Sequence, residues 1–342
     1  MYKGDVMNYV GTFISGFESS IEKLLKEKLS DVKIIDIYSG LVIFSTNNNV
    51  EKLPFFNNVY LLINKINYKN DNFNNNVKDV IKTKINYNDL KKYISEKNRT
   101  FKIKAFKENQ PSKFDYRLVS NIENEIKSYL HLKVSNTPNN EFIIQQRSEG
   151  IILFMLKISN NRLTEKDIAK GSLRPEMSYL LVSLANLTSN DIVLDPFFGS
   201  GSIPKTIVKY FNYNMCFASE LNHECVESLK KEYKNNNKKL FIKEKDATNL
   251  DCFNNEFIDV IITDPPWNIF NRDESINYVE FYNKMLTEFY RVLKNDGRVI
   301  VLMGNKIDFE EAIKVNNNFK IDSTLSVLVN GKKANVYYIT KK

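Results

Sequence analysis

Residues 191–201 have the sequence DIVLDPFFGSG, in which a short apolar strand runs into a turn with two glycines. Gly199 and Gly201 permit a tight turn and let a ligand approach the backbone without a Cβ in the way. A helical pattern follows over 203–211. Ligands of open α/β sheets bind in the crevice outside the carboxyl ends of the strands. The stretch therefore predicts one strand of a parallel sheet, followed by a ligand-binding turn and a helix.

The C-terminal half repeats this alternation of strand and helix. Continuous apolar strands separated by helices indicate a parallel sheet that is covered on both faces. Asn330-Gly331 lies between the β-rich runs 323–329 and 334–340, which predicts a closing antiparallel hairpin. The predicted fold class is α/β, a Rossmann-like doubly wound sheet with an antiparallel terminal hairpin. The expected strands are 191–195, 215–220, 240–246, 259–264 and 298–302, and the expected helices are 203–211, 223–235 and 278–293.

The N-terminal half has an α+β pattern instead. A strand over 9–13, a helix over 17–29 and two strands, 34–38 and 41–44, form its first block. Ser39-Gly40 between those two strands is a hairpin signal. The second block comprises strand 101–106, a helix near 114–130 and strands 142–146 and 151–158. We expect a hinge between the halves near 160–171.

Charge and composition narrow the class of protein. Residues 1–160 carry 24 Lys and Arg against 17 Asp and Glu, whereas residues 161–342 carry 25 against 24. An excess of positive charge in one half suggests a polyanion partner, although lysines also serve simply to solubilise a surface. Three cysteines and two histidines argue against a disulfide framework and a histidine-built metal site. Without a membrane-length apolar run or a signal-peptide pattern, the sequence predicts a soluble, cytoplasmic protein without a metal.

Acidic residues at successive strand ends predict a cofactor site. Asp195 ends the first parallel strand, and Glu220 ends the next, 19 residues after Gly201, where an acid can bind ribose hydroxyls. Asp246-Ala247 ends the following strand, where an acid and a backbone amide can bracket an adenine. Pro204 replaces the third glycine of the dinucleotide fingerprint, so a pyrophosphate is not supported. An adenosine ligand without a diphosphate is S-adenosylmethionine.

The loop after the fourth strand is the candidate for chemistry. In Asp264-Pro265-Pro266-Trp267, the prolines stop the strand and stiffen the loop. The Asp264 carboxylate and the Pro265 carbonyl can then accept hydrogen bonds from one exocyclic amine and aim it at a methyl donor. Trp267 offers a face on which a base can stack. A rigid strand-to-loop junction with Trp267 in the core is the structural alternative. The chain has no Pro-Cys dipeptide and no phosphate loop, which disfavours a cysteine-nucleophile methyltransferase and an NTPase.

With these motifs the chain resembles the THUMP-containing class I RNA methyltransferases that methylate the exocyclic N2 of guanine in tRNA. The resemblance is strongest over 170–340 and rests on residues 171–179, on the turn 195–204, on the loop 264–267 and on the closing hairpin 327–337. It implies a ferredoxin-like region over 1–70, a THUMP RNA-binding domain over 71–160 and a class I methyltransferase domain over 161–342.

The resemblance also implies a role for each motif residue. Asp195, Phe197, Gly199 and Gly201 would surround the methionine end of S-adenosylmethionine, Glu220 would hold its ribose, and Asp246 and Ala247 its adenine. Asp264, Pro265 and Pro266 would form the catalytic loop, with Trp267 stacked on the base. Trp267-Asn268 stands where the tRNA enzymes more often have Tyr-Gly or Phe-Gly, and Asp-Pro-Pro-Trp is also typical of enzymes that methylate an adenine amine.

The hypotheses from the sequence therefore differ in target and in class. The first is a tRNA guanine-N2 methyltransferase, and the second changes the target to an adenine amine or to a guanine of ribosomal RNA. The third is a non-catalytic RNA-binding protein that retains a vestigial cofactor fold. The expected partner is tRNA, other structured RNA being possible, with no membrane; the oligomeric state is left open. The candidate phosphate contacts are Lys102, Lys104, Lys107, Lys113 and Arg147.

Overall fold

A computed structural model describes residues 7–159, 172–233, 237–267, 277–329 and 331–342. The chain divides into two compact units, and the first contains residues 1–13 and 22–162. The second contains residues 14–21 and 163–342. The hinge expected over 160–171 lies outside the described residues.

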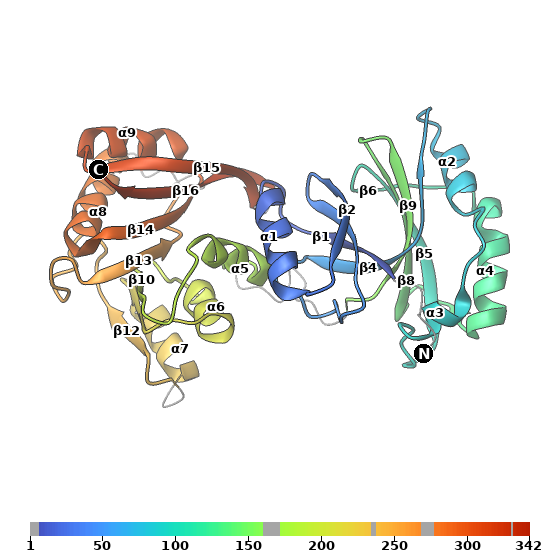
Figure 1. Cartoon of the computed structure of the whole chain (residues 1–342), viewed down its shortest axis with the longest axis horizontal. Coiled ribbons are helices and arrows are strands. Elements are labelled where there is room, and N and C mark those ends of the chain that lie inside the picture. The colour runs from blue at the N-terminus through green and yellow to red at the C-terminus, as the bar shows by residue number, and fades with distance from the viewer. Residues whose placement is uncertain (1–6, 160–171, 234–236, 268–276, 330) are drawn as a thin grey trace. The chain divides into compact units, whose positions relative to one another are not determined.

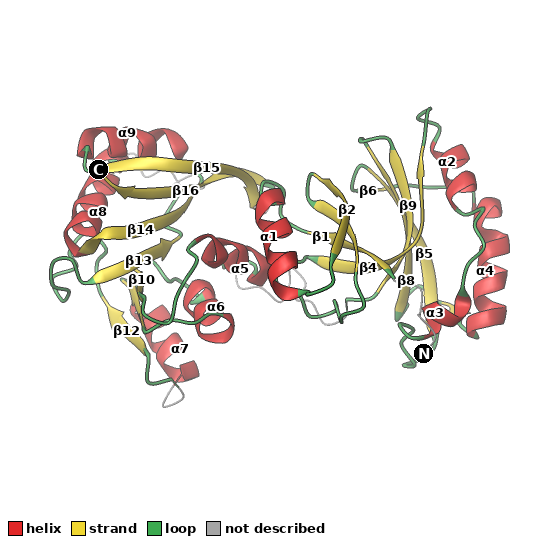
Figure 2. Ribbon diagram, viewed as in Figure 1, coloured by secondary structure: helices red, strands yellow, loops and turns green. Residues whose placement is uncertain are grey.

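The first unit is built on one continuous sheet of nine strands. Its order is β2-β3-β1-β4-β9-β8-β5-β6, with β7 paired to β5 (Figure 2). The pairing of β4 with β9 is antiparallel and joins the two α+β blocks, so the boundary expected at residue 70 falls inside a single sheet. The strands are β1 (Asn8–Thr12), β2 (Lys33–Tyr38), β3 (Leu41–Ser45), β4 (Asn58–Asn67), β5 (Thr100–Lys107), β6 (Gln110–Pro111), β7 (Lys133–Val134), β8 (Asn140–Arg147) and β9 (Ile151–Lys157).

The helices of the first unit follow from apolar spacing and capping. In α4 (Tyr116–Leu130), Val119, Ile122 and Ile126 are buried at helical spacing, and the Asp115 side chain caps the first turn by accepting from the Arg117 amide. α2 (Phe73–Val80) packs on β4, β8 and β9, and α3 (Tyr87–Lys91) packs on α4. These helices cover one face of the sheet (Figure 1).

The second unit contains a seven-stranded sheet in the order β12-β11-β10-β13-β14-β16-β15. The first five strands are parallel, and β16 pairs antiparallel with both β14 and β15, so the sheet ends in the antiparallel hairpin that the sequence predicted. All four residues of β10 are buried, which explains its unbroken apolar run. The strands are β10 (Ile192–Asp195), β11 (Met215–Glu220), β12 (Leu240–Glu244), β13 (Ile258–Thr263), β14 (Leu293–Met303), β15 (Phe319–Val329) and β16 (Lys332–Lys341).

Helices lie on both faces of this second sheet (Figure 1). α8 and α9 pack together on one face, where Tyr282, Phe289 and Phe309 are fully buried in the main core. α5 and α6 pack on each other, and α7 packs on β11 and β12. The order of strands and the two helical layers place the carboxyl ends of β10, β11 and β13 at one edge. The helices are α5 (Pro175–Leu184), α6 (Ser202–Tyr210), α7 (His223–Tyr233), α8 (Tyr278–Val292) and α9 (Lys306–Asn316).

A short N-terminal segment, residues 14–21, belongs to the second unit. It includes the start of α1 (Glu18–Lys28), and its Gly16 lies against β15. A Cβ on Gly16 would lie 2.2 Å from the Ser326 carbonyl oxygen, and its φ is +102°. Only glycine permits this close approach of the two backbones.

In the described part of the chain, every helix is too short or too polar to cross a lipid bilayer.

Candidate active site

The turn between β10 and α6 positions the first group of candidate residues. Gly199 and Gly201 have φ values of +52° and +82°, which residues with a side chain rarely adopt. A Cβ on Gly201 would lie 2.6 Å from Leu229 Cδ1, whereas one on Gly199 would have no atom of the described residues within 4 Å. Pro204 lies in the first turn of α6, where its missing N–H leaves no helical bond unmade. Gly201 is thus needed for packing, and Gly199 faces open space.

Asp195 ends β10 as a fully buried carboxyl. Its Oδ1 accepts hydrogen bonds from the Phe197 amide at 3.2 Å and from the Thr263 hydroxyl at 3.1 Å. Its Oδ2 is buried and has no partner among the residues that the structure describes. Burial raises the pKa of the Asp195 carboxyl to about 8, and the negative charges of Asp264 and Glu220 add to the rise. A cation or a hydrogen-bond donor beside Oδ2 would favour the ionised form.

Glu220 links the glycine turn to the end of β11. Its Oε2 accepts from the Gly199 amide at 3.0 Å, and its Oε1 accepts from the amides of Leu221 and Asn222 at 2.9 and 3.0 Å. The next side chain, Leu221, is 66% exposed. An aliphatic side chain that projects beside an acidic strand end offers an apolar surface to a flat ring.

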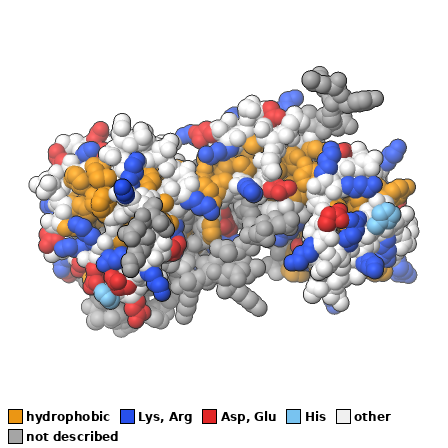
Figure 3. All heavy atoms as spheres, turned by 90° about the horizontal axis from the view of Figure 1, so that it is seen from below, with side chains coloured by type: hydrophobic (Ala, Val, Ile, Leu, Met, Phe, Trp, Pro, Cys, Tyr) orange, Lys and Arg blue, Asp and Glu red, His pale blue; other side chains and the backbone are white. Residues whose placement is uncertain are grey.

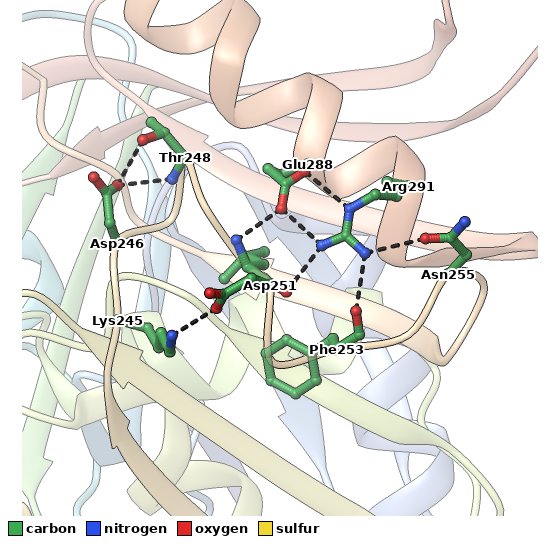
Figure 4. A network of polar contacts seen from close by, with 9 residues as sticks. Lys245, Asp246, Thr248, Asp251, Phe253, Asn255, Glu288 and Arg291 are labelled. Carbon is green, nitrogen blue, oxygen red and sulfur yellow. Dashed lines mark hydrogen bonds and ion pairs between the residues drawn. The ribbon is translucent and has the colours of Figure 1, made fainter.

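Asp246 and Ala247 follow β12 at the same edge of the sheet. Asp246 Oδ1 accepts from both the amide and the hydroxyl of Thr248 at 2.8 Å, which fixes a tight turn (Figure 4). Ala247 is 2% exposed. The parallel register pairs Glu220 with Glu244, so Asp246 comes two residues beyond the point level with Glu220.

The loop after β13 carries the remaining candidates. Asp264 is partly buried, and its Oδ1 accepts a hydrogen bond from the Trp267 indole N–H at 2.8 Å. Burial raises the pKa of the Asp264 carboxyl to about 7, and the hydrogen bond from Trp267 opposes that rise. The Tyr282 hydroxyl donates to the Pro266 carbonyl at 2.7 Å and ties the loop to α8. Pro265 is buried, and Trp267 packs partly against the core.

Neighbouring strands bring Asp195 and Asp264 together. β10 and β13 pair in parallel, and Thr263, which precedes Asp264, donates to Asp195. The two carboxyl groups interact electrostatically. The sequence analysis missed Thr263, Leu221 and Tyr282, because their roles depend on contacts between separate elements. Of the three, only Leu221 could have been found from the sequence, as an apolar residue directly after an acidic strand end. Asn268 and Gly171, which also belong to the quoted motifs, lie outside the described residues.

Comparisons with known proteins agree with this geometry. Residues 205–333 match the model of the RMKL-like methyltransferase domain family. Over the whole chain, the fold resembles the crystal structure of TrmN from Thermus thermophilus with a TM-score of 0.77 and 17% identity, covering 98% of this chain and 100% of that one. The C-terminal unit thus has the fold of a methyltransferase, and its residues 205–333 are similar to a methyltransferase domain family.

Two curated relatives from Methanocaldococcus jannaschii match parts of the chain. One, a tRNA (guanine(10)-N2)-dimethyltransferase, is 28% identical over 152 residues, which cover 41% of this chain and 40% of the relative. The other, a tRNA (guanine(6)-N2)-methyltransferase, is 26% identical over 199 residues, which cover 47% of this chain and 51% of the relative. The chain thus spans about half the length of the curated relatives it matches or less.

The residues of the methyltransferase domain fit S-adenosylmethionine, the methyl donor of this fold. The buried, unpartnered Asp195 Oδ2 suits a cationic or hydrogen-bond-donating ligand, and the open space beside Gly199 leaves room for it. Glu220, Asp246 and the apolar Leu221 follow around the edge in the order that a ribose and an adenine require. When bound, the donor would supply the electrophilic methyl group.

Replacing either of the two glycines in the turn between β10 and α6 is expected to cause a different defect. Gly201→Ala is expected to lower the free energy of unfolding by about 2–3 kcal/mol, because the new Cβ meets Leu229 in a left-handed conformation. Gly199→Ala should cost only about 1 kcal/mol but weaken binding of S-adenosylhomocysteine about tenfold, because its Cβ enters the space kept for the ligand. Denaturant unfolding and calorimetry measure the two effects. Equal loss of affinity in both variants, with equal stability, would contradict this assignment.

The candidate phosphate-binding residues of the first unit have mostly internal partners. Lys102 donates to Asn136, Lys104 is ion-paired with Glu141, and Lys107 with Asp71 at 2.6 Å. Arg147 is 8% exposed and bonds the Ser39 carbonyl and Glu149, whereas Lys113 is exposed. On the face seen in Figure 3, basic side chains are interspersed with acidic ones. The role of these residues in RNA binding stays a prediction.

Proposed function

We propose that this chain transfers a methyl group from S-adenosylmethionine to the exocyclic N2 amine of a guanosine in tRNA. The observation that carries the proposal is the pair of a fully buried Asp195 and a partly buried Asp264, which interact electrostatically at the carboxyl ends of adjacent parallel strands. One belongs to the cofactor turn and the other to the loop that would hold the amine. The two relatives, both tRNA guanine-N2 methyltransferases, support the choice of base and RNA.

In this reaction, the loop 264–267 would orient the exocyclic amine, which is a weak nucleophile. The Asp264 carboxylate and the Pro265 carbonyl each accept one N–H of the amine, so that the nitrogen lone pair faces the methyl group. The N–C bond forms as the C–S bond breaks, and the sulfur keeps the electron pair. The methylated nitrogen then loses a proton, which Asp264 is placed to accept. The Trp267 ring would stack on the base, which contributes about 1–3 kcal/mol in other nucleic-acid sites.

The N-terminal unit would act as the tRNA-binding part. We propose that it contains a THUMP module, which the excess of positive charge over residues 1–160 supports. The three cysteines of the chain are all free thiols, which supports a cytoplasmic location.

The experiment that tests the proposal is transfer of a tritiated methyl group to total tRNA and total ribosomal RNA, followed by nucleoside mass spectrometry. We expect N2-methylguanosine in the tRNA fraction. Methyladenosine as the sole product would replace guanine by adenine as the target, and product only in ribosomal RNA would replace tRNA. Binding of the donor without transfer to any RNA would favour the non-catalytic alternative.

A further inference from the structure

The segment 245–257, which joins β12 to β13, contains no helix or strand. It nevertheless carries Asp246 and Ala247, the residues expected to bracket the adenine. An irregular segment holds such residues in place only if other elements satisfy its backbone groups. Figure 4 shows that two side chains of α8, Glu288 and Arg291, do so.

Arg291 binds two carbonyls of the segment at once. Its Nη2 donates to the Leu250 carbonyl and its Nη1 to the Phe253 carbonyl, both at 2.9 Å, and Nη1 also reaches Asn255 Oδ1 at 3.1 Å (Figure 4). The planar guanidinium, with five donors in a fixed fork, is the side chain that can make these bonds together. An ammonium could satisfy one carbonyl but not this set.

Glu288 completes the arrangement from the preceding turn of α8. Its Oε1 and Oε2 accept from Arg291 Nε and Nη2 at 2.9 and 2.7 Å, so the ion pair is bidentate. Oε2 also accepts the Leu250 amide at 2.7 Å. The pair therefore holds both the N–H and the C=O of Leu250, and it keeps the guanidinium from rotating away.

The N-terminal end of the segment, at Lys245, is also held in place. The Lys245 amide donates to the Glu220 carbonyl at 3.1 Å, and the Lys245 ammonium pairs with Asp251 at 2.6 Å. Asp246 and Ala247 lie between this anchor and Leu250. With Lys245 and Leu250 both held, the turn between them has little freedom. The bonds from α8 to Leu250 therefore help to set the positions of Asp246 and Ala247.

We propose that Arg291, held by Glu288, is a positioning residue for the adenosine half of the cofactor. It touches neither cofactor nor target base and acts through the segment 245–257. The inference rests on the proposed function, because it presumes that S-adenosylmethionine binds at this edge. It predicts that a substitution on α8 changes cofactor affinity and leaves tRNA affinity unchanged.

The test compares Arg291→Met with Arg298→Met. Arg298 is the matched control, because it likewise pairs with a carboxylate, that of Asp191 at 3.0 Å, and donates to a carbonyl, that of Ala185, but its hydrogen bonds and ion pairs do not involve 245–257. By calorimetry, Arg291→Met is expected to raise the Kd for S-adenosylhomocysteine about tenfold. Arg298→Met should lower the melting temperature and leave that Kd within twofold of wild type.

Two further measurements separate positioning from a loss of stability. Hydrogen exchange at the Leu250 amide should be faster in Arg291→Met than in Arg298→Met when both are folded. In steady-state assays, KM for S-adenosylmethionine should rise, with KM for tRNA and kcat near wild type. Arg291→Lys should recover part of the affinity, since one carbonyl can still be bonded, and Glu288→Gln should give a smaller defect.

The outcomes distinguish this inference from the proposed function. A folded Arg291→Met protein with wild-type affinity for S-adenosylhomocysteine would overturn the inference, as would an equal loss in Arg298→Met. If Arg291→Met does not fold, the affinities of Arg291→Lys and Glu288→Gln for S-adenosylhomocysteine test the inference in its place, and wild-type affinity in both would overturn it. Absence of S-adenosylhomocysteine binding by the wild-type chain would instead remove the proposed function itself.

Discussion

Replacing Asp264 with alanine is expected to reduce the rate of methyl transfer about 10²–10³-fold while cofactor affinity stays near wild type. The carboxylate would hold one N–H of the target amine, and without it the nitrogen lone pair is no longer aimed at the methyl group. Asp264 belongs to the loop after β13, whereas Gly199, which faces the open space for the cofactor, belongs to the turn after β10. Single-turnover transfer of a tritiated methyl group to tRNA measures the rate, and calorimetry with S-adenosylhomocysteine measures affinity.

Two variants control this experiment. Asp264→Asn keeps an oxygen that accepts a hydrogen bond and should retain more activity than Asp264→Ala. Asp296→Ala removes an exposed carboxyl elsewhere in the same domain and should transfer methyl groups at the wild-type rate. The assignment of Asp264 to the amine would be wrong if Asp264→Ala kept its rate, or if it lost cofactor affinity to the same extent as its rate.

Methyl transfer is expected to depend on pH with a midpoint near 7. Burial raises the pKa of Asp264 to about 7, so the carboxylate form dominates above that pH and the protonated form below it. Only the carboxylate leaves both oxygens able to accept hydrogen bonds. The rate constant at saturating donor should therefore fall about tenfold per pH unit well below the midpoint, or about 50-fold from pH 7 to pH 5, and be level above pH 8.

The controls for the pH profile use the neighbours of Asp264. Asp264→Asn should be flat between pH 5 and pH 8, because an amide does not titrate in this range. In Trp267→Phe the aromatic face remains but the indole N–H is lost, so the midpoint should move above that of the wild type. Cofactor affinity is measured at each pH, because burial also raises the pKa of Asp195, to about 8. An unchanged profile in Asp264→Asn would assign the titration to another group.

The sequence predicted the C-terminal sheet well because its strands are recognisable as apolar runs. β10, β13 and the inner part of β14 are continuous apolar runs that end in acidic or polar residues, and Asn330-Gly331 marks the closing hairpin. Asp195, Glu220 and Asp264 were found for the same reason, since each stands where such a run stops.

Elements that depend on distant partners were harder to predict. β4 was missed because asparagine and lysine interrupt its apolar residues, and its place follows from pairing with β1 and β9 on either side. Helices α2, α3, α5 and α9 were not predicted either. α3, α5 and α9 begin without a side-chain capping hydrogen bond, whereas α2 is capped by Asn72 but lies in an asparagine-rich stretch. The ion pairs of Lys104 and Lys107 join residues more than thirty positions apart, which no local pattern reveals.

The glycine contact between Gly16 and β15 has a consequence for how the protein is made. Residues 14–21 are synthesised before the other residues of the second unit, 163–342, which include the strand that Gly16 contacts. The second unit can therefore complete its packing only after β15 has been synthesised. A fragment that begins after residue 21 would lack this piece, so we expect the isolated catalytic half to be purified in better yield when residues 14–21 are supplied with it.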